Sequence, residues 1–216
     1  MELLTNVLNS IKPILETLYY LASIGLFATV IIGLKQLQVV KKDMNTRNQR
    51  AAVEKSIEYL KWFSSDYLPK FSKMVSEFDD NDVEVKINPI NPMFLPDESH
   101  KTKEVQAFIA KAHNNDAIDM LNSLEFFSAA VLNGLADEEI VYKPIVKPYC
   151  SVVCFLYPVI CNYRVKENST SGFSNIIELF EIWNSRHKKE TMKFAKSHLE
   201  REISEIADIN IKSIGL

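Results

Sequence analysis

The sequence predicts an all-α fold in which an N-terminal transmembrane helix continues as a stalk into a cytoplasmic bundle of four or five helices. Three observations predict it. Residues 17–34 form an uncharged, mostly apolar run, apolar residues recur at helical spacing through most of the remaining chain, and the 216 residues include only 5 Gly and 8 Pro. So few Gly and Pro residues disfavour turn-rich all-β folds. Hydrophobic residues make up 47% of the chain and the net charge is −3, which excludes a disordered chain and argues against a general nucleic-acid binder.

The predicted membrane span covers residues 14–34 and follows a short non-cytoplasmic tail over residues 1–13. A helix needs about 20 apolar residues to cross a bilayer. Tyr19 and Tyr20 lie near one end of the run, where aromatic rings favour the membrane interface. Two alternatives stay open: a cleaved signal peptide, which the acidic start and the long apolar run disfavour, and a buried helix of a soluble protein.

Small residues on the predicted span offer a face through which copies of the chain can pack against one another. The face consists of Gly25, Ala28, Thr29 and Gly33. Ordinary membrane-helix composition explains the same residues, so a homo-oligomer through the span is one of two interpretations.

Basic residues follow the apolar run and predict its orientation. They are Lys35, Lys41, Lys42, Arg47 and Arg50. Because positively charged flanks stay on the cytoplasmic side, the C-terminal body is predicted in the cytoplasm of a bacterium and the N-terminus outside its inner membrane. The same five side chains are predicted to contact anionic lipids of the inner leaflet.

Residues 35–78 are predicted to form a basic juxtamembrane stalk and the first bundle helix, which Pro69 kinks or ends. Residues 79–102 form a proline-rich loop. Within it, residues 83–87 alternate in polarity, as in one edge strand or a lone extended segment. Local anchoring of the loop is expected from Ile90, Met93, Phe94 and Leu95.

Residues 103–216 are predicted to form the helical cytoplasmic domain. Its first helical region covers residues 103–135. A new N-cap at Asn114 or Asn115 divides this region into two helices, and Gly134 is the expected C-cap of the second. A short helix then starts at Asp137, because acidic residues favour a helix N-terminus.

The uncharged run over residues 148–163 is predicted to be the buried central helix of the bundle. A second membrane span is the alternative, which the positive-inside rule disfavours because nine Lys and Arg residues follow. After a linker over residues 167–172, one or two helices are expected from Phe173 onward. Arg186 and Glu190 are expected on an exposed face of this region.

The sequence holds no recognisable constellation for catalysis, a metal or a cofactor. Cys150, Cys154 and Cys161 share a helix face and are expected to be small buried hydrophobes. The pair Asp116 and Asp119 could hold a cation, although surface carboxylates rarely do. The histidines lack metal-site spacing and are expected to be exposed; they are His100, His113, His187 and His198. The protein is therefore predicted to be non-enzymatic and without a cofactor, and an enzyme with an unrecognised site is the least favoured alternative.

Acidic residues are concentrated in the middle of the chain, where residues 76–140 carry fourteen acidic and four basic residues. This stretch, or the proline-rich loop, is the predicted docking surface for a cytoplasmic protein or nucleoprotein partner. Direct sequence-specific binding of nucleic acid is not expected.

Residues 47–52 and 121–138, with Pro158 in an apolar helix and the later Trp183, resemble an uncharacterised family of bacterial proteins. These proteins have one N-terminal span, a basic juxtamembrane helix and a helical cytoplasmic domain. The resemblance covers residues 14–190 in outline. Some small membrane proteins of this kind are encoded beside anti-phage systems, so the resemblance implies a growth-arresting effector of antiviral defence. Membrane disruption by oligomerised spans is the output expected of such an effector from the small residues of the span. No catalytic residue carries over from the resemblance.

The function predicted from the sequence is a membrane-anchored effector or interaction module. The alternative that the sequence leaves open is a membrane-tethered scaffold for a neighbouring complex.

Overall fold

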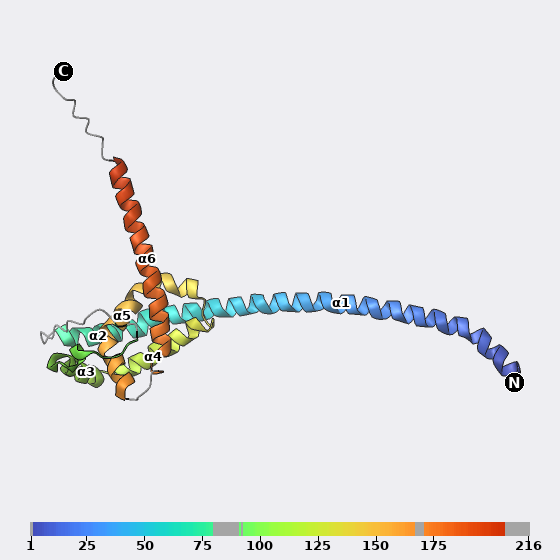
Figure 1. The fold of residues 1–216 in the computed structure, drawn as a ribbon, viewed down its shortest axis with the longest axis horizontal. Helices are drawn as coiled ribbons and strands as arrows, with labels where there is room; N and C mark the ends of the chain where they lie inside the picture. Colours follow the sequence, from blue (N-terminus) through green and yellow to red (C-terminus); the bar gives the residue numbers. More distant parts are fainter. Residues whose placement is uncertain (1, 80–90, 92, 167–170, 206–216) are drawn as a thin grey trace, which may run out of the picture. The chain divides into compact units, whose positions relative to one another are not determined.

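A computed structural model describes residues 2–79, 91, 93–166 and 171–205, and over these residues the chain is all-α, as predicted (Figure 1). The elements in chain order are α1 (Glu2–Trp62), η1 (Phe63–Tyr67), α2 (Leu68–Asp79), η2 (Glu98–Lys101), α3 (Lys103–Asn114), α4 (Ala117–Leu132), α5 (Glu138–Lys166) and α6 (Ser174–Glu205). The chain divides into two compact units, residues 1–50 and residues 51–216.

The first unit is the N-terminal part of α1, which is helical throughout its described residues. Between Pro13 and Pro69 the sequence contains no proline, so no backbone donor is missing from the hydrogen-bond ladder of the helix. Gly25 and Gly33 are the two residues of lowest helix propensity in this stretch.

The break predicted at Pro69 takes the form of a π-helical turn, η1, directly before it. Proline cannot donate to the carbonyl of Ser65, and its ring would collide with that carbonyl in a regular α-helix. The backbone N–H of Leu68 instead donates to the carbonyl of Phe63, five residues earlier. The chain therefore continues into α2 rather than stopping, and the rings of Phe63 and Tyr67 stack in the core with centroids 5.2 Å apart.

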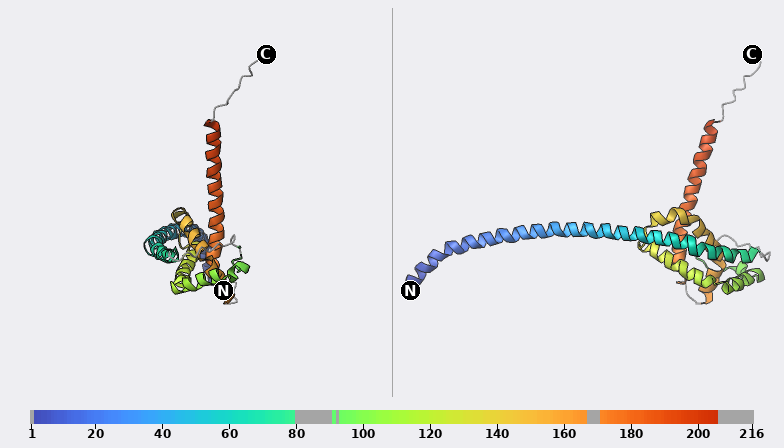
Figure 2. Two further views of the ribbon diagram at one scale, coloured as in Figure 1. Left: turned by 90° about the vertical axis from the view of Figure 1, so that its left-hand side faces the viewer. Right: turned by 180° about the vertical axis from the view of Figure 1, so that it is seen from behind.

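The core of the second unit is built around α5 and the first half of α6, and the predicted bundle is thereby confirmed. Both α4 and α5 pack against α6, and α3 packs against α4 and α5 (Figure 2). Trp183 of α6 is fully buried, and its ring centroid lies 5.0 Å from Tyr149, 5.6 Å from Tyr142 and 6.2 Å from Phe127. Large aromatic side chains that interlock in this way contribute much of the apolar area a bundle buries.

The helix start predicted at Asp137 is confirmed, but the predicted short length is wrong, because α5 is one helix of 29 residues. Asp137 caps it: its Oδ1 accepts the backbone N–H groups of Glu139 at 3.0 Å and Ile140 at 3.3 Å. The helix then passes through three prolines without ending. The run 148–163 is mostly buried in the bundle, as predicted for a central helix, and this packing offsets the cost of the prolines.

Two turns differ in how well the sequence predicted them. The N-cap of α4 is Asp116, neither Asn114 nor Asn115, and it has a left-handed φ of 57° without a side-chain cap hydrogen bond. Gly134 does follow the end of α4, with φ of 70°. Its N–H donates to Val131 at 3.1 Å while Leu135 donates back to Ala130, which is the Schellman arrangement that favours glycine.

The described part of the proline-rich loop is anchored by one aromatic residue. Phe94 is fully buried, with its ring 5.1 Å from Tyr157 and 5.8 Å from Phe180. Met93, expected to help anchor the loop, is exposed, and Leu95 is half-buried. The alternating residues 83–87 and Ile90 lie outside the described residues.

Candidate functional site

The first candidate site is the exposed apolar part of α1. Side chains from residue 11 to residue 50 are exposed, apart from the half-buried Gly33. An 18-residue window in this helix has a mean hydropathy of 1.9, and none of it is buried. By length and composition, this helix and α5 are both able to cross a membrane, but the corresponding window of α5 is 61% buried inside the bundle. An uncovered apolar surface of this extent marks an interaction site for lipid or protein.

Three hydroxyl groups in the apolar stretch of this helix, those of Thr17, Ser23 and Thr29, are satisfied within the helix itself. Each donates to a backbone carbonyl three or four residues earlier: Thr17 to Pro13 at 2.8 Å, Ser23 to Tyr19 at 2.8 Å and Thr29 to Leu26 at 2.7 Å. A hydroxyl without a hydrogen bond is costly in an apolar environment. The internal hydrogen bonds therefore make this surface compatible with lipid.

The small residues predicted as a contact face are exposed on this helix. A Cβ atom added at Gly25 or Gly33 meets no atom within 4 Å. Ala28 and Thr29 lie between them and are exposed too. A larger side chain at either glycine would therefore disturb only contacts made with something outside the chain.

The predicted lipid-contacting side chains are also exposed; they are Lys35, Lys41, Lys42, Arg47 and Arg50. Arg47 pairs with Asp43, with Nε and Oδ2 2.9 Å apart. This pair is one helical turn apart and highly exposed, so it contributes little to stability. The basic side chains are thus presented to solvent in a stretch of four turns below the apolar window.

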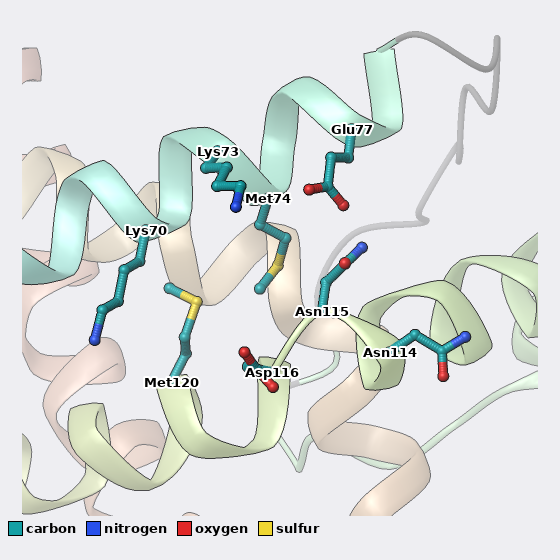
Figure 3. Close-up of a pocket in the computed structure, with 8 residues that line it drawn as sticks. All are labelled: Lys70, Lys73, Met74, Glu77, Asn114, Asn115, Asp116 and Met120. Atoms are coloured by element: carbon teal, nitrogen blue, oxygen red, sulfur yellow. The ribbon is translucent and has the colours of Figure 1, made fainter.

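The second candidate site is a charged groove between α2 and the α3–α4 turn (Figure 3). It has a volume of about 220 Å³ and is lined by Lys70, Lys73, Met74, Glu77, Asn114, Asn115, Asp116 and Met120. Figure 3 shows Met74 and Met120 pointing toward each other across it, while Asn114 points away. The left-handed backbone at Asp116 sets the sharp turn that opens this space.

A second cavity of about 170 Å³ adjoins the first and shares Lys70, Asp116 and Met120 with it. Asp66 of η1 and Asp119 of α4 also line it. The structure therefore brings the sequence-predicted acidic pair together with a third aspartate. Over the described residues, however, no three His, Cys, Asp or Glu side chains are placed to hold a metal ion. The two methionines and the mixed charges instead suit the side chains of a peptide.

A third feature joins α5 to α6 where α6 leaves the bundle. Arg186 Nη1 donates to both carboxylate oxygens of Glu138 at 3.1 Å, and its Nε donates to Glu190 at 3.2 Å. The guanidinium carbon lies 3.9 Å from the centre of the Tyr142 ring. Trp183 Nε1 donates to Glu138 at 2.9 Å, and the Tyr142 hydroxyl donates to Glu190 at 2.8 Å. We call these five residues the α5–α6 latch.

The latch perturbs the groups that form it. Burial, together with the hydrogen bond to Glu190, raises the pKa of Tyr142 to about 12. The same hydrogen bond lowers the pKa of the Glu190 carboxyl. Glu190 is exposed, as expected, whereas Arg186 is half-buried against Glu138, a residue 48 positions before it that no local pattern connects to it.

The expected exposure of the histidines is wrong for His100. It is buried, with Nδ1 3.0 Å from Asp97 Oδ1 and its ring centroid 5.5 Å from Tyr157. Phe94 packs against Tyr157 of α5 and so holds this loop against the bundle. In the sequence, only the spacing of three residues between Asp97 and His100 could have indicated that the histidine has a partner.

The three cysteines are free, and only one of them matches its expectation. Cys161 is buried, Cys150 is half-buried and Cys154 is exposed. Burial raises the pKa of the Cys150 and Cys161 thiols to about 12, so the reactive thiolate is scarce at both.

A family model described as "Domain of unknown function (DUF4760)" matches residues 23–183. The match runs from within the apolar part of α1 through the bundle to Trp183, and so includes the charged groove and most of the exposed apolar part of α1. No curated protein and no solved structure matches the chain. The predicted membership of an uncharacterised family is confirmed, over a range slightly shorter than the predicted residues 14–190. The chain belongs to the family described as Domain of unknown function (DUF4760).

Proposed function

We propose that the protein is a membrane-anchored interaction module in which α1 crosses the bilayer and residues 51–216 bind a partner. The exposed apolar window of α1 carries this proposal, because lipid is the environment that removes so continuous an apolar surface from water. Internal hydrogen bonding of the hydroxyls at Thr17, Ser23 and Thr29 supports it.

The basic residues between Lys35 and Arg50 favour one orientation. Their side chains are exposed directly after the apolar window, where they can meet anionic lipid headgroups. We therefore place the bundle on the cytoplasmic side of a bacterial inner membrane, with the N-terminus outside.

The charged groove supports a protein or nucleoprotein partner. Lys70 and Lys73 stand on one wall, and Asp116 stands on the other. A peptide segment carrying both charge signs fits this arrangement better than a polyanion would.

In the effector form of the proposal, partner binding controls contacts between spans through Gly25, Ala28, Thr29 and Gly33, and the assembled spans disrupt the membrane and arrest growth. The open face around the two glycines supports this form. In the scaffold form, the anchor only holds the bundle beside a neighbouring complex.

The anchor is tested by expressing the full chain and a version without residues 1–34, followed by membrane isolation and alkaline carbonate washing. We expect the full chain to stay in the washed membranes and the shortened chain to stay in the supernatant. Release of the full chain by carbonate would overturn the proposal. A periplasmic-active reporter fused to the N-terminus tests the orientation.

The two forms are separated by growth and membrane potential during expression. Arrest with depolarisation by the full chain alone supports the effector form, and we then expect Gly25→Leu to relieve both. Ser23→Leu is the matched control, because Ser23 lies on the opposite side of the helix from the small-residue face. If cells that express the full chain keep normal growth and a normal membrane potential, and the chain still binds its partner, the scaffold form is supported.

A further inference from the structure

The last part of α6 is a helix that has no neighbour over most of its surface among the residues that the structure describes. Every side chain from Lys188 to Glu205 is exposed. Figure 2 shows this part of α6 continuing beyond the other helices of the second unit. We call residues 188–205 the outer segment. The α5–α6 latch, through Arg186, fixes the point from which it departs.

An apolar stripe follows one side of the outer segment. Met192, Leu199 and Ile203 are 70%, 57% and 68% exposed, and Ala195 lies between the first two. Their spacing of three or four residues places them on one helix face. Met192 is nine residues after Trp183, which at 100° per residue places it on the opposite side of α6 from the core. The stripe therefore cannot be covered by the bundle of its own chain.

Charge is divided along the same segment. Residues 188–197 carry four Lys and one Glu, whereas residues 198–205 carry three Glu and one Arg. The lysines surround Met192, which lies in an open hollow of about 470 Å³. The segment is thus basic at one end and acidic at the other, with the apolar stripe along one side and Phe194, which is 72% exposed, on the opposite side.

We propose that two copies of this chain pair through their outer segments, antiparallel, about a two-fold axis close to residue 198. This register places Met192 level with Ile203 of the second copy, so that the isoleucine fills the hollow between the lysines. It also places Lys196 level with Glu200 of the second copy, and each such contact occurs twice. Within one chain Lys196 Nζ lies 3.5 Å from Glu200 Oε1, so in the pair each lysine lies between two glutamates. A parallel pairing would set basic residues against basic ones.

The division of charge favours a second copy over the other partner that the stripe could bind, an anionic lipid surface. Lipid would attract the lysines around Met192 but repel Glu200, Glu202 and Glu205, which accompany Leu199 and Ile203. The segment is about 27 Å long at 1.5 Å per residue. It buries less than a standard interface of about 800 Å² per partner, so we expect a dissociation constant that is roughly micromolar.

Cysteine cross-linking of the full chain in detergent tests the register. In a Cys154→Ser background, Leu199→Cys places two thiols near the axis, and mild oxidation is expected to give a covalent dimer. Ser197→Cys is the matched control, because two residues along a helix place it on the far face. Equal dimer yields at the two positions, or none at residue 199, would overturn the proposal.

Charge exchange tests the same contact without a covalent bond. We expect Lys196→Glu and Glu200→Lys each to weaken association at least about tenfold, measured by energy transfer between labelled copies. Mixing the two variants is expected to restore association, because Lys–Glu pairs then form only between chains. Circular dichroism checks that both variants keep their helix content.

Vesicles containing phosphatidylglycerol distinguish the lipid alternative. Binding of the outer segment to lipid would make Lys196→Glu weaker and Glu200→Lys stronger in vesicle binding, and mixing the variants would restore nothing. That pattern would overturn the proposal. Association is measured in detergent between α6 variants, so a failure to associate would not contradict the membrane-anchor proposal. Release of the chain from membranes by carbonate would likewise not contradict the pairing of outer segments.

Discussion

Glu125 is the residue through which α4 caps the N-terminus of α6. Its Oε1 accepts the backbone N–H of Asn175 at 3.1 Å and the side-chain Nδ2 at 2.7 Å, while Oε2 accepts the backbone N–H of Ile176 at 2.9 Å. The side chain is half-buried, 50 residues away in sequence from the helix that it caps. It therefore replaces the local cap that a helix N-terminus usually receives.

The substitution Glu125→Ala removes all three hydrogen bonds. Loss of an N-cap costs about 0.5–2 kcal/mol, and loss of a carboxylate at a helix N-terminus adds about 0.3–1 kcal/mol. We expect the free energy of unfolding to fall by about 2 kcal/mol, which corresponds to roughly 4–8 °C in Tm for a chain of this size. Glu125→Gln keeps one acceptor oxygen but loses the charge, and about 1 kcal/mol, or roughly 2–4 °C, is expected.

Tryptophan fluorescence during heating of the full chain in detergent measures the effect. The chain has 2 Trp, and both Trp62 and Trp183 lie in the second unit, so the signal reports the bundle rather than the anchor. Asn122→Ala, on the exposed side of the same helix, is the control and is expected to change stability by less than about 0.5 kcal/mol. A Glu125→Ala protein with the same Tm as the Asn122→Ala control would refute the capping argument.

Three further predictions follow from burial and backbone geometry. Burial raises the pKa of Tyr142 and Tyr157 to about 12, so the stability that they contribute is complete below their usual pKa of about 10 and is lost as the pH rises through 12; absorbance at 295 nm should show both ionising only at alkaline unfolding. A thiol reagent at pH 8 should modify Cys154 in the folded chain and Cys161 only after unfolding, and Cys154→Ser should abolish the fast phase. Gly134→Ala should cost about 1 kcal/mol in thermal unfolding through its φ of 70° alone, because the added Cβ meets no atom within 4 Å.

The helical elements were largely predictable because their signals are local. The uncharged run near the N-terminus, the apolar periodicity of α4 and the glycine after it act over a few residues, and Gly134 adopts the backbone expected of it. The errors came where packing overrides local signals. Pro144 and Pro148 would end an exposed helix, but both lie inside α5, whose buried side chains hold the helix together.

The features of the candidate sites divide in the same way. The exposed face of Gly25 and Gly33 and the basic residues after it were predicted, because they belong to one helix and need only its periodicity. The groove was not predicted as a whole, because Lys70 and Asp116 meet only when α2 packs beside the α3–α4 turn. The burial of His100 was not predicted for the same reason, because it depends on where Phe94 anchors the loop.

The sequence by itself determined that the protein is all-α and that an apolar helix precedes a basic stretch. Each of these is a property of one helix and follows from residue spacing. Only the tertiary structure decided that Glu125 caps α6, that Glu138 holds Arg186, and that the stripe through Met192 faces away from the core. Such contacts join residues about 50 positions apart, and their partners are chosen by the packing of whole helices rather than by any pattern along the chain.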